Sequence, residues 1–348
     1  MSFFRDNIDA MAAYVPGAQP EAGRPVVKLN QNENPYPPSP LALAALESFN
    51  GVALRRYPDP MAPAFSAVAA EVLNVEPERI VVGDGSDDLI IMLARAVAGP
   101  GRTIAYPEPT FPYYFTQAQV QGAPVAAVPC DADFALPLEA LAATDAALTF
   151  LSSPNSPTGA AATIDQLDWL AGELSGLLVI DEAYADFAAD NALELVDAHD
   201  NVVVLRTLSK GYSLAGLRLG FAVAGKAIVE GLLKTKAIYN VGPLPAAIGA
   251  AALADQAYHD ECMAAIIAER KRLATALIQR EFFVYPSHGN FLLATVPGGD
   301  GQAMYETLKA DGILVRYFNS PLLRDKLRIS IGTADDTDAL LTAIDAML

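Results

Sequence analysis

Residues 201–220 have the sequence NVVVLRTLSKGYSLAGLRLG, and this stretch decides the predicted fold. The run NVVVLR (201–206) is short, apolar and β-branched, as expected for a buried strand. Lys210 follows that strand, and two hydroxyls and a guanidinium lie close to it in the sequence: Thr207, Ser209 and Arg218. Most lysines are solvated surface charges. Ligands collect at the carboxyl ends of parallel strands, however, so we expect Lys210 to point into an anion-binding cleft.

Short apolar runs alternate with helical segments along the middle of the chain. The predicted strands span residues 79–83, 102–106, 123–128, 146–152, 177–181, 201–206 and 219–224. The predicted helices between them span residues 87–98, 111–121, 164–173 and 212–216. This alternation predicts an α/β fold, in which helices cover both faces of a mostly parallel sheet.

The chain divides into three predicted regions. Residues 1–44 form an N-terminal arm, rich in Pro, Asn and Gly, that we expect to join the small domain. Residues 45–240 form the large domain. Residues 241–348 form a small α+β domain, in which an Ala-rich helical stretch (245–280) precedes short strands.

The composition limits the classes of function that fit the chain. Hydrophobic residues make up 52% of the 348 residues, which is enough to bury a large core. The formal net charge of −18 argues against a nucleic-acid partner, because phosphate backbones are bound by clustered Lys and Arg. The two cysteines lie far apart and indicate neither a disulfide framework nor a metal site. No signal peptide or membrane span is recognisable, so we expect a cytoplasmic protein without a membrane partner.

Three polar motifs lie at the ends of predicted strands. GDGSDD (83–88) opens a helix whose N-terminus suits a phosphate, although simple helix capping explains the same residues. SPNSPTG (153–159) places Asn155 in a turn, where asparagine is common for conformational reasons. DEAY (181–184) begins with Asp181, a carboxylate at the end of a buried strand that needs a partner. Taken singly, each motif is compatible with a structural role.

The order of the motifs resembles that in the fold-type I pyridoxal-phosphate (PLP) aminotransferases: SPNSPTG, then DEAY, then SKGYSLAGLRLG (209–220). Further motifs are similar to those of the histidinol-phosphate aminotransferase family and extend the resemblance over nearly the whole chain. They are AYVPG (13–17), LNQNENPYPPSP (29–40), RRYPDP (55–60), GDGSDDLI (83–90), PTFPYY (109–114), KAIYNVGPL (236–244), GNFLL (289–293), GILVR (312–316) and LRISIGT (327–333). The resemblance implies a transaminase of histidine biosynthesis that converts histidinol phosphate and 2-oxoglutarate to imidazole-acetol phosphate and glutamate.

The resemblance also implies how the chain holds PLP. Lys210 would bind the cofactor as a Schiff base and move the proton between the substrate Cα and the cofactor. Four side chains would contact the ring: Asp181 at its nitrogen, Asn155 and Tyr184 at its phenolic oxygen, and Phe111 by stacking. The phosphate would be held by Gly85, Ser86, Asp87, Thr207, Ser209 and Arg218. Tyr57 would reach this phosphate from the neighbouring subunit of a homodimer with a shared active site.

The implied substrates are a small-molecule amino donor and a 2-oxo acid. Arg328 in LRISIGT would bind their anionic groups, because a guanidinium fork accepts either a phosphate ester or a carboxylate. Four further residues would line the substrate pocket: Arg316, Tyr14, Asn32 and Tyr239. No metal ion is expected.

The sequence departs from the family pattern near the implied site. GDGSDD replaces the usual GNGSDE, Ser156 stands where a second Asn is common, and GPLPAAI (242–248) is less polar than usual. Aromatic amino-acid aminotransferases and PLP decarboxylases of phosphorylated amino acids would share the cofactor residues, so both stay open as alternatives. A PLP-binding sensor without turnover would be expected to carry a basic helix-turn-helix extension, and none is visible. An NAD-dependent dehydrogenase would need the dinucleotide glycine spacing, which the chain lacks.

Overall fold

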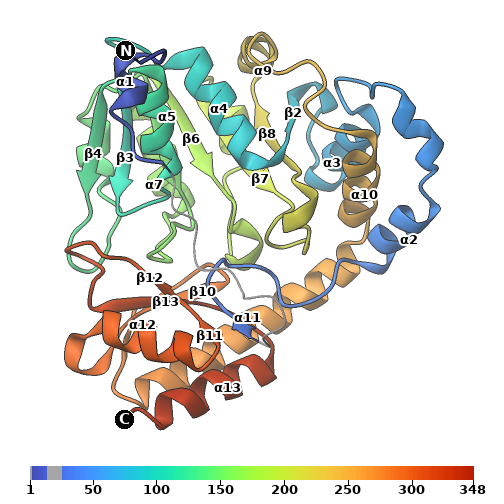
Figure 1. Cartoon of the computed structure of the whole chain (residues 1–348). Helices are drawn as coiled ribbons and strands as arrows, with labels where there is room; N and C mark the ends of the chain where they lie inside the picture. Colours follow the sequence, from blue (N-terminus) through green and yellow to red (C-terminus); the bar gives the residue numbers. More distant parts are fainter. Residues whose placement is uncertain (1, 14–25) are drawn as a thin grey trace.

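The computed structural model describes residues 2–13 and 26–348, and within these the large domain is built on a seven-stranded sheet (Figure 1). Its strands are β2 (Ile80–Gly83), β3 (Ile104–Glu108), β4 (Val125–Pro129), β5 (Leu148–Ser152), β6 (Leu177–Asp181), β7 (Val202–Thr207) and β8 (Gly220–Ala224). They lie in the order β2-β8-β7-β6-β5-β3-β4. Only β8 runs antiparallel to its neighbours within this sheet of the described chain. The predicted α/β class with a mostly parallel sheet is therefore confirmed.

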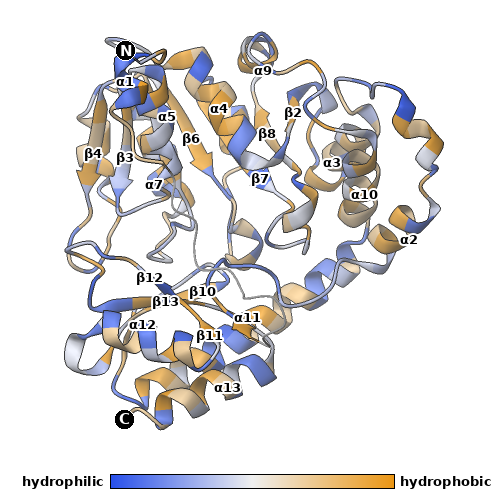
Figure 2. Cartoon of the chain, in the orientation of Figure 1, coloured by the Kyte–Doolittle hydropathy of each residue, from blue (hydrophilic) through white to orange (hydrophobic). Residues whose placement is uncertain are grey.

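Helices cover both faces of this sheet, as predicted. Successive side chains of a strand point to opposite faces. Val202 and Val204 accordingly pack into one apolar cluster, and Val203 and Leu205 into another. The first cluster contains residues of α2 (Pro40–Ser48), α3 (Pro63–Leu73), α7 (Ile164–Glu173) and α10 (Pro243–Ala254). The second contains residues of α4 (Gly85–Val97), α5 (Tyr113–Gln121) and α9 (Lys226–Leu233). Burial on both faces explains why β6 and β8 are apolar along most of their length (Figure 2).

The small domain contains an antiparallel sheet in the order β12-β13-β10-β9. These strands are β9 (Phe283–Val284), β10 (Phe291–Thr295), β12 (Arg316–Tyr317) and β13 (Lys326–Ser330). The helices of this domain are α11 (Gln256–Ile278), α12 (Gly301–Ala310) and α13 (Ala334–Asp345), in the lower part of Figure 1. β1 (Val27–Lys28) pairs in parallel with β11 (Ile313–Leu314), so residues 27–28 join this domain. Residues 5–9 instead contact α5 of the large domain, through hydrogen bonds from Arg5 and Asn7 to its backbone. The remaining α-helices of the described residues are short: α1 (Asp6–Asp9), α6 (Leu138–Ala142) and α8 (Leu195–Ala198).

Two predicted helical segments differ from the structure. The segment 212–216 is a turn followed by one 3₁₀ turn (Ala215–Leu217), with Ser213 and Arg218 at φ values of 59° and 55°. The stretch 245–280 breaks at Asp255 into α10 and α11. α10 packs in the core of the large domain, whereas α11 packs in the core of the small one. The proposed limits of 1–44, 45–240 and 241–348 for the three regions stay a prediction.

None of the helices in the described ranges combines the length and apolar character that crossing a membrane requires.

Candidate active site

The carboxyl ends of β5, β6 and β7 meet at one edge of the large sheet. Ser152, the last residue of β5, lies directly opposite Asp181, the last residue of β6. A cavity of about 190 Å³ opens at this edge, as expected at the carboxyl ends of parallel strands. Nine residues that the sequence assigned to the cofactor line it: Ser86, Asp87, Phe111, Asp181, Tyr184, Thr207, Ser209, Lys210 and Arg218.

A second cavity of about 480 Å³ continues from the first into the space between the two domains. The two cavities share Phe111, Ser156, Tyr184, Ser209, Lys210 and Arg218. Three predicted substrate residues line the second cavity: Asn32, Arg316 and Arg328. The predicted cofactor and substrate residues of these lists therefore form one continuous site.

Lys210 lies where the two cavities join, three residues beyond the end of β7. Its Nζ donates a hydrogen bond to the backbone oxygen of Gln31 at 3.0 Å and lies 5.8 Å from the centre of the Tyr184 ring. The loop that carries Lys210 (residues 208–219) is called the lysine loop. Its backbone is fixed by Asn34, whose side-chain amide donates to the carbonyl oxygens of Lys210 and Gly211 at 3.1 and 3.0 Å. The amine is thus positioned by both the large domain and the N-terminal segment.

Asp181 is a carboxylate with 4% exposure at the end of β6. Burial raises its pKa, and hydrogen bonds from the Tyr114 hydroxyl and the Ala183 N–H oppose this rise. The Tyr114 Oη–Asp181 Oδ2 distance is 2.6 Å. In the described parts of the chain Asp181 forms no ion pair, so its charge can be offset by a cation entering the cavity.

Tyr184 is the third polar group beside the lysine. Asn32 donates a hydrogen bond from Nδ2 to Tyr184 Oη at 3.0 Å. Burial acts to raise the pKa of Tyr184, but the positive charges of Lys210 and Arg328 together with hydrogen bonds from Asn32 and Ser156 lower it below its ordinary value. The phenolic oxygen of Tyr184 is therefore held in a setting that favours negative charge.

The N-terminus of α4 and Arg218 form a cradle that suits a phosphate. Arg218 Nη2 donates to Asp87 Oδ2 at 3.0 Å, and its Nη1 lies 3.5 Å from Ser209 Oγ. Gly85 has a φ of +76°, and a Cβ there would lie 2.4 Å from Arg218 Nη2. Only glycine lets the arginine approach the helix so closely. The unpaired N–H groups at a helix start and a guanidinium are two established devices for binding phosphate.

Arg316 and Arg328 bring two positive charges to the second cavity. They are direct partners in the antiparallel pairing of β12 and β13. Arg328 donates to Ser156 Oγ at 2.9 Å and to the backbone oxygen of Asn30 at 2.8 Å. Like charges directly opposite each other on a sheet destabilise it. An anion bound between the two guanidinium groups would remove this repulsion.

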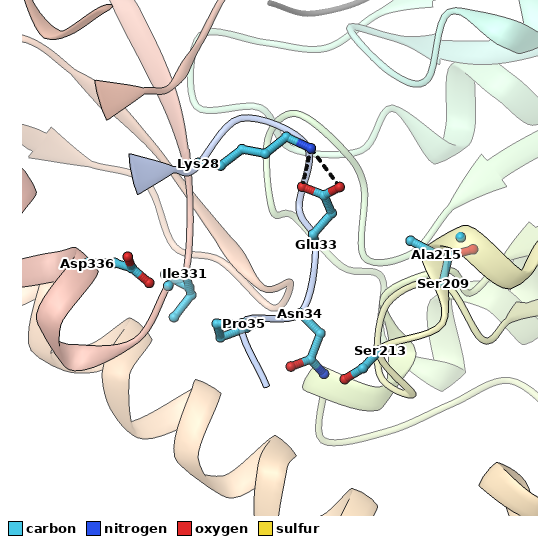
Figure 3. Close-up of a pocket in the computed structure, with 11 residues that line it drawn as sticks. Lys28, Glu33, Asn34, Pro35, Ser209, Ser213, Ala215, Ile331 and Asp336 are labelled. Atoms are coloured by element: carbon cyan, nitrogen blue, oxygen red, sulfur yellow. Dashed lines mark hydrogen bonds and ion pairs between the residues drawn. The ribbon is translucent and has the colours of Figure 1, made fainter. Parts of the chain in front are cut away.

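A crevice of about 440 Å³ lies next to the site between the two domains. Figure 3 shows Lys28 facing Glu33 on the N-terminal segment, with Nζ 2.7 Å from the carboxylate. Asn34 and Ser213 line the same crevice. The segment that includes Glu33 and Asn34 thus forms the bridge from β1 to the loop that carries Lys210.

Some predicted site residues lie away from the cavities. Asn155 is fully buried, and its amide donates to the Pro109 oxygen and to Thr158 Oγ1, at 2.9 and 3.0 Å. Tyr57 is 82% exposed and stacks on Tyr239 with ring centres 4.6 Å apart, and neither residue lines the two cavities. Gly85 lies behind Arg218 without lining the cavity. Tyr14 falls outside the described residues.

Two polar contacts close behind the site were not predicted from the sequence. Tyr114 donates to Asp181, as described above. Glu182, the residue after Asp181, forms a buried ion pair with Arg206 at 2.7 Å. Burial raises the pKa of Glu182, and the Arg206 charge opposes that rise. This pair ties the ends of β6 and β7 together, so it helps to fix the positions of Asp181 and Lys210.

The model of the family "Aminotransferase class I and II" matches residues 24–344. The chain belongs to this family. It is 49% identical over 347 residues to histidinol-phosphate aminotransferase 1 of Trichormus variabilis, covering 100% of this chain and 99% of that protein. It is 42% identical over 344 residues to histidinol-phosphate aminotransferase of Syntrophotalea carbinolica, covering 99% of each.

A solved structure of this aminotransferase family agrees with the fold. Histidinol-phosphate aminotransferase from Sinorhizobium meliloti in complex with pyridoxal-5'-phosphate matches with a TM-score of 0.91 and 26% identity, over 100% of this chain and 99% of that one. The predicted family, the fold-type I architecture and PLP as cofactor are confirmed. The roles of the individual site residues stay predictions.

Proposed function

We propose that this aminotransferase transfers the amino group of histidinol phosphate to 2-oxoglutarate, in the histidine biosynthesis of the cytoplasm. The observation that carries the proposal is the opposed pair Arg316 and Arg328 in the cavity that also holds Lys210. Histidinol phosphate offers a phosphate ester and no carboxylate, whereas 2-oxoglutarate offers two carboxylates. Two guanidinium groups can bind either kind of anion in turn. The names of the full-length relatives support the same substrate.

The residues around the smaller cavity fit PLP. Asp181 offers a buried carboxylate for the ring nitrogen, and Phe111 offers an aromatic face for the ring. Tyr184 would donate to the phenolic oxygen. The cradle of Ser86, Thr207, Ser209 and Arg218 would hold the phosphate. When bound, PLP supplies an aldehyde that takes up the amino group and a ring that delocalises the electron pair left at the substrate Cα.

The side chains of this protein then have separate tasks. With PLP bound, the Lys210 Nζ would take the proton from the substrate Cα and return it on the cofactor side. The Asp181 carboxylate would stabilise a positive charge on the ring nitrogen of PLP, and so favour the protonated form of that nitrogen. Arg316 and Arg328 hold the anionic end of the substrate, so the Cα–H bond is fixed relative to Lys210. The second half of the reaction repeats these tasks with 2-oxoglutarate.

We further propose that the active site is completed by a second copy of the chain. Tyr57 and Tyr239 form an exposed aromatic stack, although an isolated chain gains nothing from exposing it. Other exposed apolar residues lie on the same segments: Leu41, Leu43, Leu46, Val52, Leu54, Met61 and Ile238. α2 and the segment before α3 lie at the right-hand margin of Figure 1, on the outer side of α10. A homodimer that buries this surface would let Tyr57 reach the phosphate cradle of its partner.

The proposal is tested by product analysis. The PLP-loaded protein is incubated with histidinol phosphate and 2-oxoglutarate, and glutamate is measured over time. Borohydride reduction of the PLP-loaded protein followed by peptide mass analysis should place the label on Lys210, and Lys210→Ala should lose both label and turnover. Release of CO₂ from a phosphorylated amino acid, without glutamate formation, would instead favour the decarboxylase alternative.

A further inference from the structure

Tyr114 lies behind the cofactor cavity and is held rigidly. Its ring is fully buried on α5 and stacks on Phe150, with ring centres 4.6 Å apart and planes 2° apart. Phe111, which precedes α5 by two residues, packs edge-on against it with ring centres 5.7 Å apart. These contacts fix the direction in which the Tyr114 hydroxyl points.

That hydroxyl points at Asp181. The 2.6 Å bond from Tyr114 ends on Asp181 Oδ2, while the N–H of Ala183 donates to Oδ1 at 3.1 Å. Each carboxylate oxygen can accept more than one hydrogen bond, so a donor in the cavity can still be accepted. Asp181 also lines the cavity, so it connects Tyr114 with whatever lies there.

We propose that Tyr114 is a positioning residue that keeps Asp181 an oriented carboxylate, so that the proton shared with PLP stays on the ring nitrogen. The inference rests on PLP binding, which the family shares, and is independent of the amino donor.

The competition for that proton explains why a donor is needed. In a buried place a carboxylate becomes more basic, and Asp181 follows this rule. Without the Tyr114 hydroxyl the pKa of Asp181 would rise further, which shifts the shared proton from the ring nitrogen toward the carboxylate. Burial raises the pKa of Tyr114 well above its usual range, so this hydroxyl stays protonated and keeps donating. A protonated ring nitrogen withdraws electrons more strongly than a neutral one, which is the property that transamination requires.

The decisive variant is Tyr114→Phe, which keeps the ring and its stack on Phe150. The dissociation constants of the variant are measured for PLP and for 1-deazapyridoxal phosphate, in which a C–H replaces the ring nitrogen. The preference for PLP over this analogue should fall by about tenfold or more, since hydrogen bonds to charged groups are among the stronger ones. The ¹⁵N resonance of labelled PLP should move from the pyridinium toward the pyridine position.

Tyr106→Phe is the matched control. Tyr106 is buried in the same core, with its ring centre 6.3 Å from that of Tyr114, but it is not one of the donors to Asp181. Its loss should leave both the preference and the ¹⁵N position unchanged. Thermal unfolding of both variants checks that the fold is retained.

A merely structural role of Tyr114 would weaken the binding of PLP and of its analogue equally. An unchanged preference together with a nitrogen that stays protonated therefore overturns the proposal. If Tyr114→Phe does not fold, replacement of Tyr114 by 3,5-difluorotyrosine provides the second test. This more acidic phenol donates more strongly, so the preference for PLP should rise, and a preference that is unchanged or lower contradicts the proposal.

Discussion

Arg316 stands directly opposite Arg328 across β12 and β13, and both guanidinium groups lie over the Phe318 ring at 5.2 and 5.6 Å. This arrangement costs stability, because like charges face each other on neighbouring strands. Anion binding by the two arginines explains why such a destabilising arrangement is present. The charge of the whole chain is −18, so an anionic substrate must be attracted by such a local concentration of positive charge.

Replacing one member of the pair should weaken substrate binding without damaging the fold. We expect Arg316→Gln to lower kcat/KM for histidinol phosphate about 10- to 100-fold, since a charge-assisted hydrogen bond contributes about 1.5–3 kcal/mol. The change should appear mainly in KM. Steady-state kinetics with both substrates measure it.

Arg324→Gln serves as the control for this prediction, because Arg324 is an exposed arginine of the same domain that lines neither cavity. It should leave kcat/KM unchanged. Equal losses in the two variants would show that general electrostatic attraction, and not the paired site, accounts for the effect.

Gly85→Ala should weaken cofactor binding. The new Cβ would lie 2.4 Å from Arg218 Nη2, so the guanidinium must leave its place beside α4. Alanine at this positive φ also costs about 1–2 kcal/mol of folding free energy. We expect the dissociation constant for PLP to rise about tenfold or more, as measured by fluorescence titration.

Gly101→Ala separates the two effects of that substitution. Gly101 has a φ of +77°, but no atom lies within 4 Å of the Cβ position. It should lose a similar amount of stability and bind PLP normally. If Gly85→Ala also binds PLP normally, the cradle around Arg218 does not hold the phosphate.

Asp181 should make the cofactor-free protein less stable as the pH rises. Its pKa is raised in the folded state by burial, so the folded chain binds this proton more tightly than the unfolded chain. Below the ordinary pKa of 3.8 both states are protonated and no penalty exists. As the pH rises through the folded pKa the penalty grows to its full value.

Without PLP, Asp181→Asn is therefore expected to be more stable than the unsubstituted chain at neutral pH, by on the order of 1 kcal/mol. The difference should shrink toward pH 4. Urea unfolding across this pH range measures it. A difference that does not vary with pH would contradict the assignment of Asp181 as the uncompensated buried carboxylate.

The shared site can be tested by mixing subunits. Lys210→Ala and Tyr57→Ala chains should each be nearly inactive. If Tyr57 acts across the interface, a mixed dimer contains one site with neither change, and mixing should restore activity. If Tyr57 acts within its own chain, every site carries one defect and mixing restores nothing.

Much of the large domain could be predicted because local sequence and burial agree there. β6 was predicted with its observed bounds, since an apolar run ends abruptly at Asp181. α7 was also predicted correctly, because Thr163 and Gln166 form a capping box at its start. Such elements carry their own start and stop signals.

Other features depend on tertiary context that no local pattern contains. The segment 212–216 looks helical, but Arg218 must turn back to α4, and Ser213 and Arg218 adopt left-handed conformations to allow it. The Ala-rich stretch 245–280 has no Gly or Pro at its break, so the change of direction at Asp255 is set by packing against two different cores.

The candidate site shows the same division. Asp181 ends β6, and Lys210 and Arg218 lie between β7 and β8, so the order of the motifs along the chain was enough to find all three. The contact of Tyr114 with Asp181 could not be predicted, because the two residues lie 67 positions apart and no sequence pattern links them. The exposed stack of Tyr57 on Tyr239 likewise depends on the fold, and its role depends on a second subunit.

The most direct test of the proposed function follows the absorbance band of the PLP-loaded protein after separate additions of histidinol phosphate, phenylalanine and glutamate. Each active donor should convert the cofactor to its amine form, and the matching oxo acid should reverse the change. We expect histidinol phosphate to convert it with kcat/KM at least about tenfold above that of phenylalanine, because only the former presents a phosphate to Arg316 and Arg328. A kcat/KM for phenylalanine that equals or exceeds that for histidinol phosphate would contradict the substrate assignment, while a band that no donor changes would contradict transamination itself.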